Sequence, residues 1–167
     1  MLTGDLKNTN SVVVHKQDSI YWMNKAAEIA NGSLCLNAKC GAIVVKDNEI
    51  IGAGYNAPAL DQEKNRMCNK EFGPRKPNYD YTCCMHAEWR AIIDALKSNS
   101  DKIKGSKLYF TRVDVDGLII KSGEPYCTVC SRLALDVGIE YFVLWHDRGI
   151  CEYPTDEYNQ LSYQYII

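Results

Sequence analysis

The chain has 167 residues, near the usual size of one domain, so we expect a single domain over residues 1–167 with its own hydrophobic core. Apolar residues make up 46% and charged residues 24%, a composition that argues against a disordered chain. Nineteen Lys and Arg against 21 Asp and Glu give a net charge of −2, which argues against a protein that binds long nucleic acids and against a polybasic membrane anchor.

The unusual feature of the composition is its eight cysteines, at positions 35, 40, 68, 83, 84, 127, 130 and 151. Residues 1–17 contain no apolar segment of the signal-peptide kind, and no apolar run approaches the roughly 18 residues that span a bilayer. We therefore expect a reducing, cytoplasmic environment and no membrane. There, cysteines serve as metal ligands, catalytic groups or small buried residues more often than as disulfides.

The N-terminal part of the chain predicts one helix after an irregular start. Residues 1–17 lack helical periodicity and are expected to form a loose lead-in. Residues 18–31 carry apolar side chains at helical spacing, with Asp18 as a candidate N-cap and Gly32 as the stop.

A β-hairpin is predicted next. The β-branched runs 41–46 and 49–54 are joined by Asp47-Asn48, two residues that suit a tight turn. Residues 55–85 contain three prolines, several charges and few apolar side chains, so they predict a long loop.

The second half alternates helices and strands. The expected elements are a helix over 86–98, a strand over 107–113, a short strand over 118–120 within the polar segment 114–124, a helix over 128–137, a strand over 139–145 and a helix from 155. The apolar face of the first of these helices is predicted to be Trp89, Ile92, Ile93 and Leu96. Helices between strands imply parallel pairing, which predicts an α/β fold whose central mixed sheet starts with an antiparallel hairpin.

The chemical signal is a group of four residues at the starts of two predicted helices. His86 and Glu88 are two residues apart, and Cys127 and Cys130 form a Cys-x-x-Cys pair. One imidazole and two thiolates are three zinc ligands, and a catalytic zinc site has three protein ligands and one open position. Zinc lowers the pKa of water, and a neighbouring carboxylate such as Glu88 can carry the proton to a leaving amine.

This pattern, His-x-Glu followed by Pro and Cys-x-x-Cys, is typical of zinc deaminases, although Tyr126 here separates Pro125 from Cys127. Two other interpretations of these residues are open. The residues can be an ordinary core histidine, a surface glutamate and an incidental cysteine pair, or the cysteines can be a redox dithiol. The second of these leaves His86 and Glu88 unexplained.

From about Ile20 to Leu144 the chain resembles the cytidine and deoxycytidylate deaminase superfamily, and within it the deoxycytidylate (dCMP) deaminase branch. The motifs that carry the resemblance, besides the four residues above, are Ser33-Leu34-Cys35, Gly41-Ala42-Ile43-Val44-Val45 and Gly54-Tyr55-Asn56-Ala57-Pro58. The resemblance implies a three-layer α/β/α fold, a zinc ion held between two helix N-termini, and a homo-oligomer. It also implies hydrolytic deamination of a cytosine nucleotide, with dCMP converted to dUMP, zinc held by His86, Cys127 and Cys130, and Glu88 carrying the proton.

The resemblance further implies that Asn56 contacts the sugar and that the backbone at Ala87 lies near the base; a turn residue is the plainer interpretation of Asn56. Tyr126, beside a metal ligand, is a candidate to stack on the base, whereas Trp89 is expected to pack inward. The cations that could meet a phosphate are Arg66, Lys70, Arg75 and Lys76.

The remaining alternatives concern the substrate and the other cysteines. The segment 114–124 can reshape the pocket mouth, so a nucleoside, a free base such as guanine, or an adenosine in RNA remain alternatives. A non-catalytic zinc scaffold would need a fourth ligand, from Cys83 or Cys84. A second metal site is possible from Cys68, Cys83 or Cys84, whereas Cys35, Cys40 and Cys151 are expected to be structural.

Overall fold

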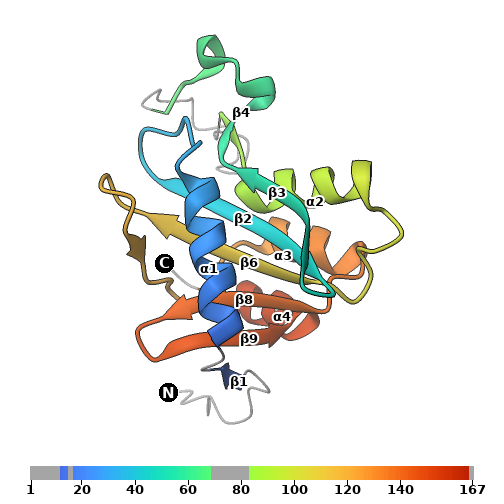
Figure 1. Cartoon of the computed structure of the whole chain (residues 1–167). Coiled ribbons are helices and arrows are strands. Elements are labelled where there is room, and N and C mark those ends of the chain that lie inside the picture. Colours follow the sequence, from blue (N-terminus) through green and yellow to red (C-terminus); the bar gives the residue numbers. More distant parts are fainter. Residues whose placement is uncertain (1–11, 15–16, 69–82, 166–167) are drawn as a thin grey trace.

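The structure, a computed structural model, describes residues 12–14, 17–68 and 83–165. In these ranges it contains a seven-stranded sheet, a small two-stranded sheet and four α-helices (Figure 1). The strands are β1 (Val12–Val14), β2 (Lys39–Lys46), β3 (Glu49–Tyr55), β4 (Ala57–Pro58), β5 (Cys84–Met85), β6 (Lys107–Val113), β7 (Ile119–Ile120), β8 (Tyr141–His146) and β9 (Gly149–Pro154). The helices are α1 (Gln17–Ala30), α2 (Ala87–Ser98), α3 (Thr128–Asp136) and α4 (Thr155–Gln164).

The large sheet is mixed and has the order β1-β9-β8-β6-β2-β3, with β7 paired to β6. Strands β6 and β8 run parallel and are connected through α3, and every other pair in this sheet is antiparallel. The predicted hairpin is confirmed as β2–β3. Its turn residues Asp47 and Asn48 have positive φ values of 49° and 61°, a backbone conformation that Asp and Asn tolerate well.

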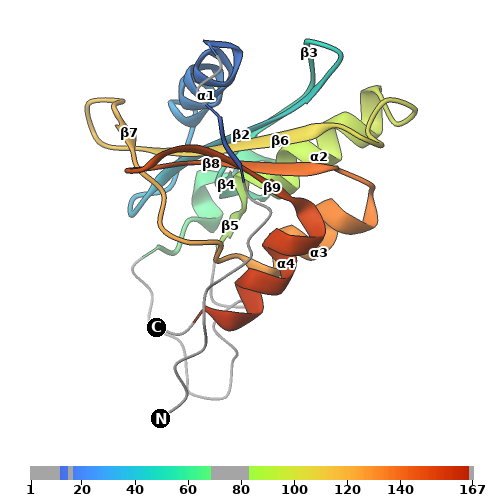
Figure 2. The same ribbon diagram turned by 90° about the horizontal axis from the view of Figure 1, so that it is seen from below.

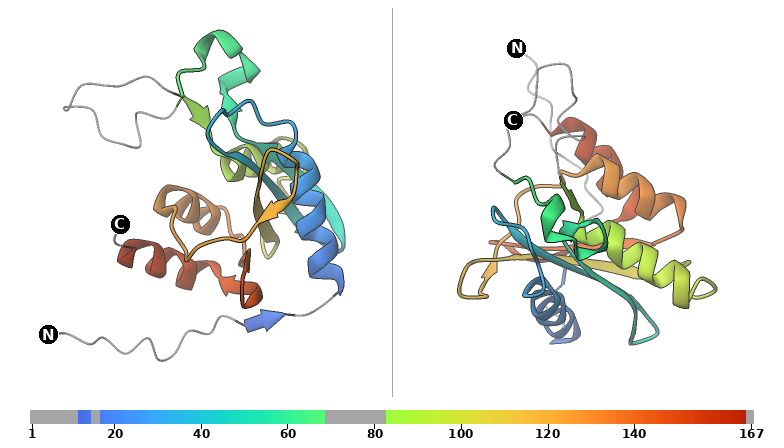
Figure 3. Two further views of the ribbon diagram at one scale, coloured as in Figure 1. Left: turned by 90° about the vertical axis from the view of Figure 1, so that its left-hand side faces the viewer. Right: turned by 90° about the horizontal axis from the view of Figure 1, so that it is seen from above.

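The helices form two outer layers. Helix α1 covers one face of the sheet, and α2, α3 and α4 cover the other (Figures 2 and 3). One hydrophobic cluster joins the sheet to α2, α3 and α4 around Phe142, and another joins it to α1 around Met23 and Ile43. The predicted α/β/α architecture with a central mixed sheet is therefore confirmed.

Helix α2 packs on the sheet through small residues, and here the predicted apolar face is partly wrong. Ala87, Ala91, Ile92 and Ala95 are buried, whereas Leu96 is exposed and Trp89 and Ile93 are only half-buried. The reason lies in the glycines of β3. A Cβ built at Gly52 or Gly54 would lie 2.3–2.7 Å from atoms of α2, so the helix backbone approaches the sheet too closely for large side chains between them.

Four further differences separate the structure from the sequence prediction. Val12–Val14, expected within the loose lead-in, form the edge strand β1. Strand β9 was not predicted, and it pairs along the whole of β8. Asp18 lies in the first turn of α1, which already begins at Gln17, so it is not the N-cap residue. The described part of the predicted 55–85 loop contains β4, β5 and two short 3-10 turns, at Ala59–Asp61 and Glu63–Asn65.

Candidate active site

The starts of α2 and α3 carry the three predicted metal ligands. His86 occupies the N-cap position of α2, and Cys127 occupies that of α3, where its sulfur accepts a hydrogen bond from the Cys130 backbone N–H at 3.4 Å. Helix N-termini are electropositive and favour the deprotonated form of a nearby thiol. The thiols of Cys127 and Cys130 therefore lie at a helix start that stabilises a thiolate, and they face the imidazole of His86.

The three side chains converge on one point. His86 Nδ1 lies 3.1 Å from Cys130 Sγ and 3.5 Å from Cys127 Sγ, and the two sulfurs are 2.6 Å apart. Around a tetrahedral zinc ion, neighbouring nitrogen and sulfur ligands are about 3.6–3.8 Å apart. An imidazole and two thiolates suit zinc, and the group can hold it once the two sulfurs separate by about 1 Å.

The charges in this group favour a cation. Hydrogen bonds from Cys130 and His86 lower the pKa of the Cys127 thiol to about 5 although burial opposes them. The hydrogen bond to Cys127 raises the pKa of His86, and burial raises that of Cys130. Cys127 is therefore a thiolate at neutral pH.

Glu88 lies beside this group in the first turn of α2, with only 5% of its surface exposed. Burial, followed by the negative charge of Cys127, raises the pKa of its carboxyl group to about 7. A group with such a pKa can both accept and release a proton near neutral pH, which is what general acid–base catalysis needs.

Asn56 connects the end of β3 to the segment that follows α1 through side-chain hydrogen bonds. Its Oδ1 accepts hydrogen bonds from Ser33 Oγ at 2.6 Å and from the Cys40 N–H at 2.8 Å, and its Nδ2 donates to the Ala38 carbonyl at 2.7 Å. The side chain therefore fixes residues 33–40 against the end of β3.

Two other predicted contact residues, Ala87 and Tyr126, are the chain neighbours of the metal-ligand candidates His86 and Cys127. Ala87 is fully buried at the first position of α2, whereas Tyr126 is 58% exposed and packs edge-on against Tyr165, with ring centroids 5.0 Å apart. Arg66 donates to the Leu34 carbonyl at 3.3 Å, and the other three predicted phosphate contacts, Lys70, Arg75 and Lys76, lie outside the described residues.

The structure adds two residues that the sequence prediction did not place at the site. Trp89 stacks on the His86 ring, with centroids 4.7 Å apart and planes 15° apart. The sequence signal for this contact is the spacing: Trp89 follows His86 by three residues at the start of one helix, and residues three apart on a helix are neighbours. Tyr158 on α4 is buried and contacts the backbone of Tyr126; burial, followed by the nearby charge of Glu88, raises its pKa well above the usual value. No sequence pattern links a residue 70 positions from Glu88 to that side chain.

Within the described ranges, the group at His86 contains three possible metal ligands, and Cys83 and Cys84 do not belong to it. A scaffold site closed by one of those cysteines is not supported, whereas three ligands fit a site with an open position. None of the helices in the same ranges has the length and apolar character that crossing a membrane requires.

Comparison with known proteins points to one family. The family model described as "Cytidine and deoxycytidylate deaminase zinc-binding region" matches residues 16–145. The deoxycytidylate deaminase of Mycobacterium phage D29 is 32% identical over 130 residues, which cover 74% of this chain and 90% of the phage protein. The deoxycytidylate deaminase of Schizosaccharomyces pombe is 30% identical over 80 residues, which cover 45% of this chain and 24% of the yeast protein.

Solved structures share the fold. The dCMP deaminase of cyanophage S-TIM5, in complex with dCMP and dUMP, has a TM-score of 0.52 at 23% identity, covering 77% of this chain and 81% of that one. The cytidine deaminase of Burkholderia pseudomallei has a TM-score of 0.55 at 15% identity, covering 83% and 94%. With the family model matching more than half of the residues, the chain belongs to the cytidine and deoxycytidylate deaminase family, and it is a deaminase.

Proposed function

We propose that the chain, acting as one deaminase domain, hydrolyses the exocyclic amino group of dCMP to give dUMP and ammonia, with zinc as its cofactor. The observation that carries the proposal is the convergence of His86, Cys127 and Cys130 beside the buried Glu88, at two helix starts of a family member. His86, Cys127 and Cys130 would hold the zinc. When bound, zinc supplies the Lewis acidity that makes water nucleophilic near neutral pH.

Glu88 moves the proton in this proposal. Its carboxylate takes a proton from the attacking water and passes it to ring N3 as the oxygen bonds to C4. It then takes the proton of the new C4 hydroxyl and gives it to the amino group, so that the C4–N bond breaks, the C4 carbonyl forms and ammonia leaves. The raised pKa of Glu88 suits both directions of transfer. Trp89 stacks on His86, and Tyr158 contacts the Tyr126 backbone. These contacts keep the starts of α2 and α3 in fixed positions relative to each other.

The choice of dCMP is supported by the deoxycytidylate deaminases among the relatives of this chain. Asn56 Nδ2 carries a second hydrogen besides the one donated to Ala38, and we assign it to the sugar. The backbone at Ala87 would contact the base, and the exposed ring of Tyr126 would cover it. Of the four cations expected to meet a phosphate, Arg66 lies within the described residues, and we assign it to the phosphate.

A substrate panel tests the proposal. Zinc-loaded protein is incubated with dCMP, CMP, deoxycytidine, cytosine, guanine and a tRNA substrate, and ammonia release is followed for each. We expect dCMP to have the highest kcat/KM, and removal of zinc by a chelator to abolish turnover until zinc is restored. Preference for the nucleoside, the free base or the RNA would replace the substrate assignment, and no turnover of any compound would overturn the proposal. Sedimentation of the same sample tests the implied homo-oligomer.

A further inference from the structure

Arg112 is an exposed cation on β6 that the sequence prediction did not place at the site. Its neighbours show which way it faces: Leu108 and Phe110 pack in the cluster formed with α2, α3 and α4, whereas Tyr109 packs in the cluster formed with α1. Side chains along a strand alternate between the two faces of a sheet. Arg112 therefore shares the face of Leu108 and Phe110, which is the face covered by the helices whose starts carry the candidate metal ligands.

The position of Arg112 along β6 brings it level with the candidate site. Arg112 pairs directly with Cys40 of β2. Two hydrogen bonds join Cys40 to Asn56: the Cys40 N–H donates to Asn56 Oδ1 at 2.8 Å, and the Asn56 N–H donates to the Cys40 carbonyl at 3.2 Å. Asn56, Cys40 and Arg112 thus form a row across one end of the sheet, about 10 Å long for two strand spacings.

The charges along this row agree with its geometry. Burial raises the pKa of the Cys40 thiol to about 12; the negative charge of Glu88 adds to this effect, and the positive charge of Arg112 opposes it. Cys40 therefore lies within electrostatic reach of both Glu88 and Arg112, and its thiol is protonated at neutral pH. A neutral thiol between them does not repel an anion.

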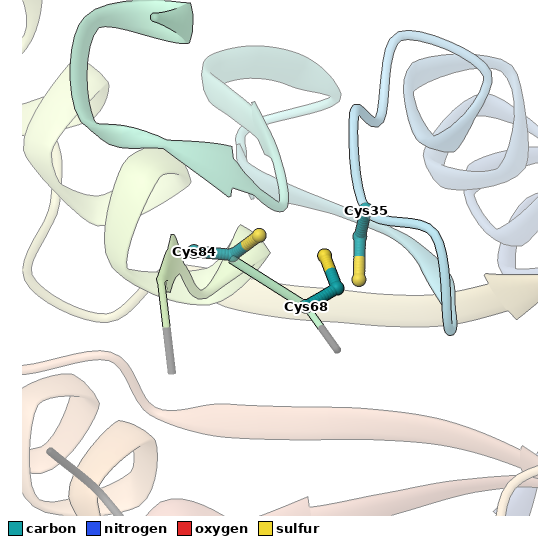
Figure 4. A group of neighbouring side chains, drawn as sticks. All are labelled: Cys35, Cys68 and Cys84. Carbon is teal, nitrogen blue, oxygen red and sulfur yellow. The ribbon is translucent and has the colours of Figure 1, made fainter. Parts of the chain in front are cut away.

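Cys40 is also distinct from the other thiols of this region. In the described ranges, one further group of sulfur atoms lies within 4.8 Å of one another and points inward, those of Cys35, Cys68 and Cys84 (Figure 4). Cys40 does not belong to that group and packs instead against the main hydrophobic cluster. The surface beside Arg112 is therefore apolar and uncharged.

The guanidinium of Arg112 is available for a ligand. Among the residues that the structure describes, it takes part in no ion pair and no side-chain hydrogen bond. The carboxylate of Asp114, two residues away, is already engaged, because its Oδ1 accepts from the N–H groups of Asp116 and Leu118 at 2.9 Å each. On its other side Arg112 pairs with Ile120 of β7, so the 114–124 segment adds an apolar flank.

We propose that Arg112 binds the 5′-phosphate of the substrate nucleotide and thereby determines the preference for dCMP over deoxycytidine. The inference rests on the proposed function, in which Glu88 acts at the base and Asn56 contacts the sugar. The phosphate is joined to that sugar through one methylene and one oxygen, and the long arginine side chain extends toward it from the far end of the row. A guanidinium can donate two parallel hydrogen bonds to a phosphate. Arg66 would assist, although one of its nitrogens already donates to the Leu34 carbonyl.

Steady-state kinetics with dCMP and deoxycytidine test the inference on the zinc-loaded full chain. Loss of a hydrogen-bonded charge pair should raise the KM for dCMP about 10- to 100-fold in Arg112→Gln, with a much smaller change for deoxycytidine, which has no phosphate. Arg112→Lys, which keeps the charge, should fall between the wild type and Arg112→Gln. Lys97→Gln is the matched control, because it removes a cation from the last turn of α2, at the opposite end from His86. Equal changes for the two substrates, or an unchanged KM for dCMP, would overturn the inference.

Binding of the products separates this inference from the proposed function. Calorimetry compares dUMP with deoxyuridine in the wild type and in Arg112→Gln, without turnover. We expect tighter binding of dUMP in the wild type and loss of that difference in the variant. A wild type that prefers dCMP as substrate while Arg112→Gln keeps the full dUMP preference would overturn the role of Arg112 and leave the proposed function standing. A wild type that binds dUMP and deoxyuridine equally and deaminates deoxycytidine better would overturn both.

Discussion

Replacing Gly54 by alanine tests how the fold positions the candidate catalytic helix. A Cβ at Gly54 would lie 2.5 Å from the Ala91 nitrogen, 2.6 Å from the Ala87 carbonyl oxygen and 2.6 Å from the Arg90 Cβ. Ordinary contacts of a Cβ begin near 3.4 Å, so the start of α2 must move by nearly 1 Å. Overpacking of this kind costs about 1–3 kcal/mol of unfolding free energy. For a chain of this size that corresponds to a fall in Tm of roughly 2–12 °C.

The same displacement moves Glu88 and His86, which lie on that first turn. A misplacement of about 1 Å can reduce the rate about 100-fold. Gly54→Ala should therefore lower kcat/KM by about that factor in a deamination assay as well as lowering Tm in a thermal melt. Gly52→Ala, which meets α2 one turn further on at Ala91 and Ala95, should lower Tm similarly with a smaller loss of activity.

Gly123→Ala is the matched control, because a Cβ there meets nothing within 4 Å. It should leave Tm and kcat/KM unchanged. If Gly54→Ala were as stable and as active as Gly123→Ala, the close approach of β3 to α2 would not be what positions the site.

Three further substitutions test other contacts. Asn56→Ala removes three hydrogen bonds and should lower the unfolding free energy by about 2–3 kcal/mol in urea titrations. A loss below about 0.5 kcal/mol would show that other contacts hold residues 33–40 in place. Tyr158→Phe keeps the stack on Phe142 but loses the contact with the Tyr126 backbone, and should cost about 1 kcal/mol in the same titration; an unchanged midpoint would contradict it. Burial lowers the pKa of His146, so below pH 6.5 the unfolded chain binds a proton at this residue that the folded chain does not bind. The unfolding free energy therefore falls as pH drops from 7 to 5, and His146→Gln should make that decrease less steep. An identical pH dependence in the variant would exclude His146 as its cause.

Periodicity and turn chemistry predicted most of the fold. The β2–β3 hairpin follows from two β-branched runs around Asp47-Asn48, and α3 follows from the apolar spacing that ends at Gly138, whose φ is 85°. Strand β9 was missed because Gly149, Glu152 and Pro154 weaken its local strand signal, and its pairing with β8 depends on tertiary contacts. The face of α2 was misjudged because the glycines that admit its alanines lie on a different element.

The site was predictable where spacing alone brings ligands together. Cys127 and Cys130 share one helix turn, and His86 and Glu88 share another, so the sequence could pair them. The three-dimensional convergence of Cys35 with Cys68 and Cys84 could not be read in this way, because each lies in an irregular segment or a two-residue strand. Sequence pointed to a metal site near Cys68, Cys83 and Cys84 but assigned Cys35 to a structural role.

In the proposed function, Glu88, beside zinc held by His86, Cys127 and Cys130, carries the proton in hydrolytic deamination. The most direct measurement is kcat for conversion of dCMP to dUMP in wild type and Glu88→Gln, with the zinc content of both determined. Loss of general acid–base catalysis predicts a decrease of about 100- to 10,000-fold in Glu88→Gln with its zinc retained. A Glu88→Gln protein that holds its zinc and turns over dCMP at the wild-type rate would show that Glu88 does not carry the proton.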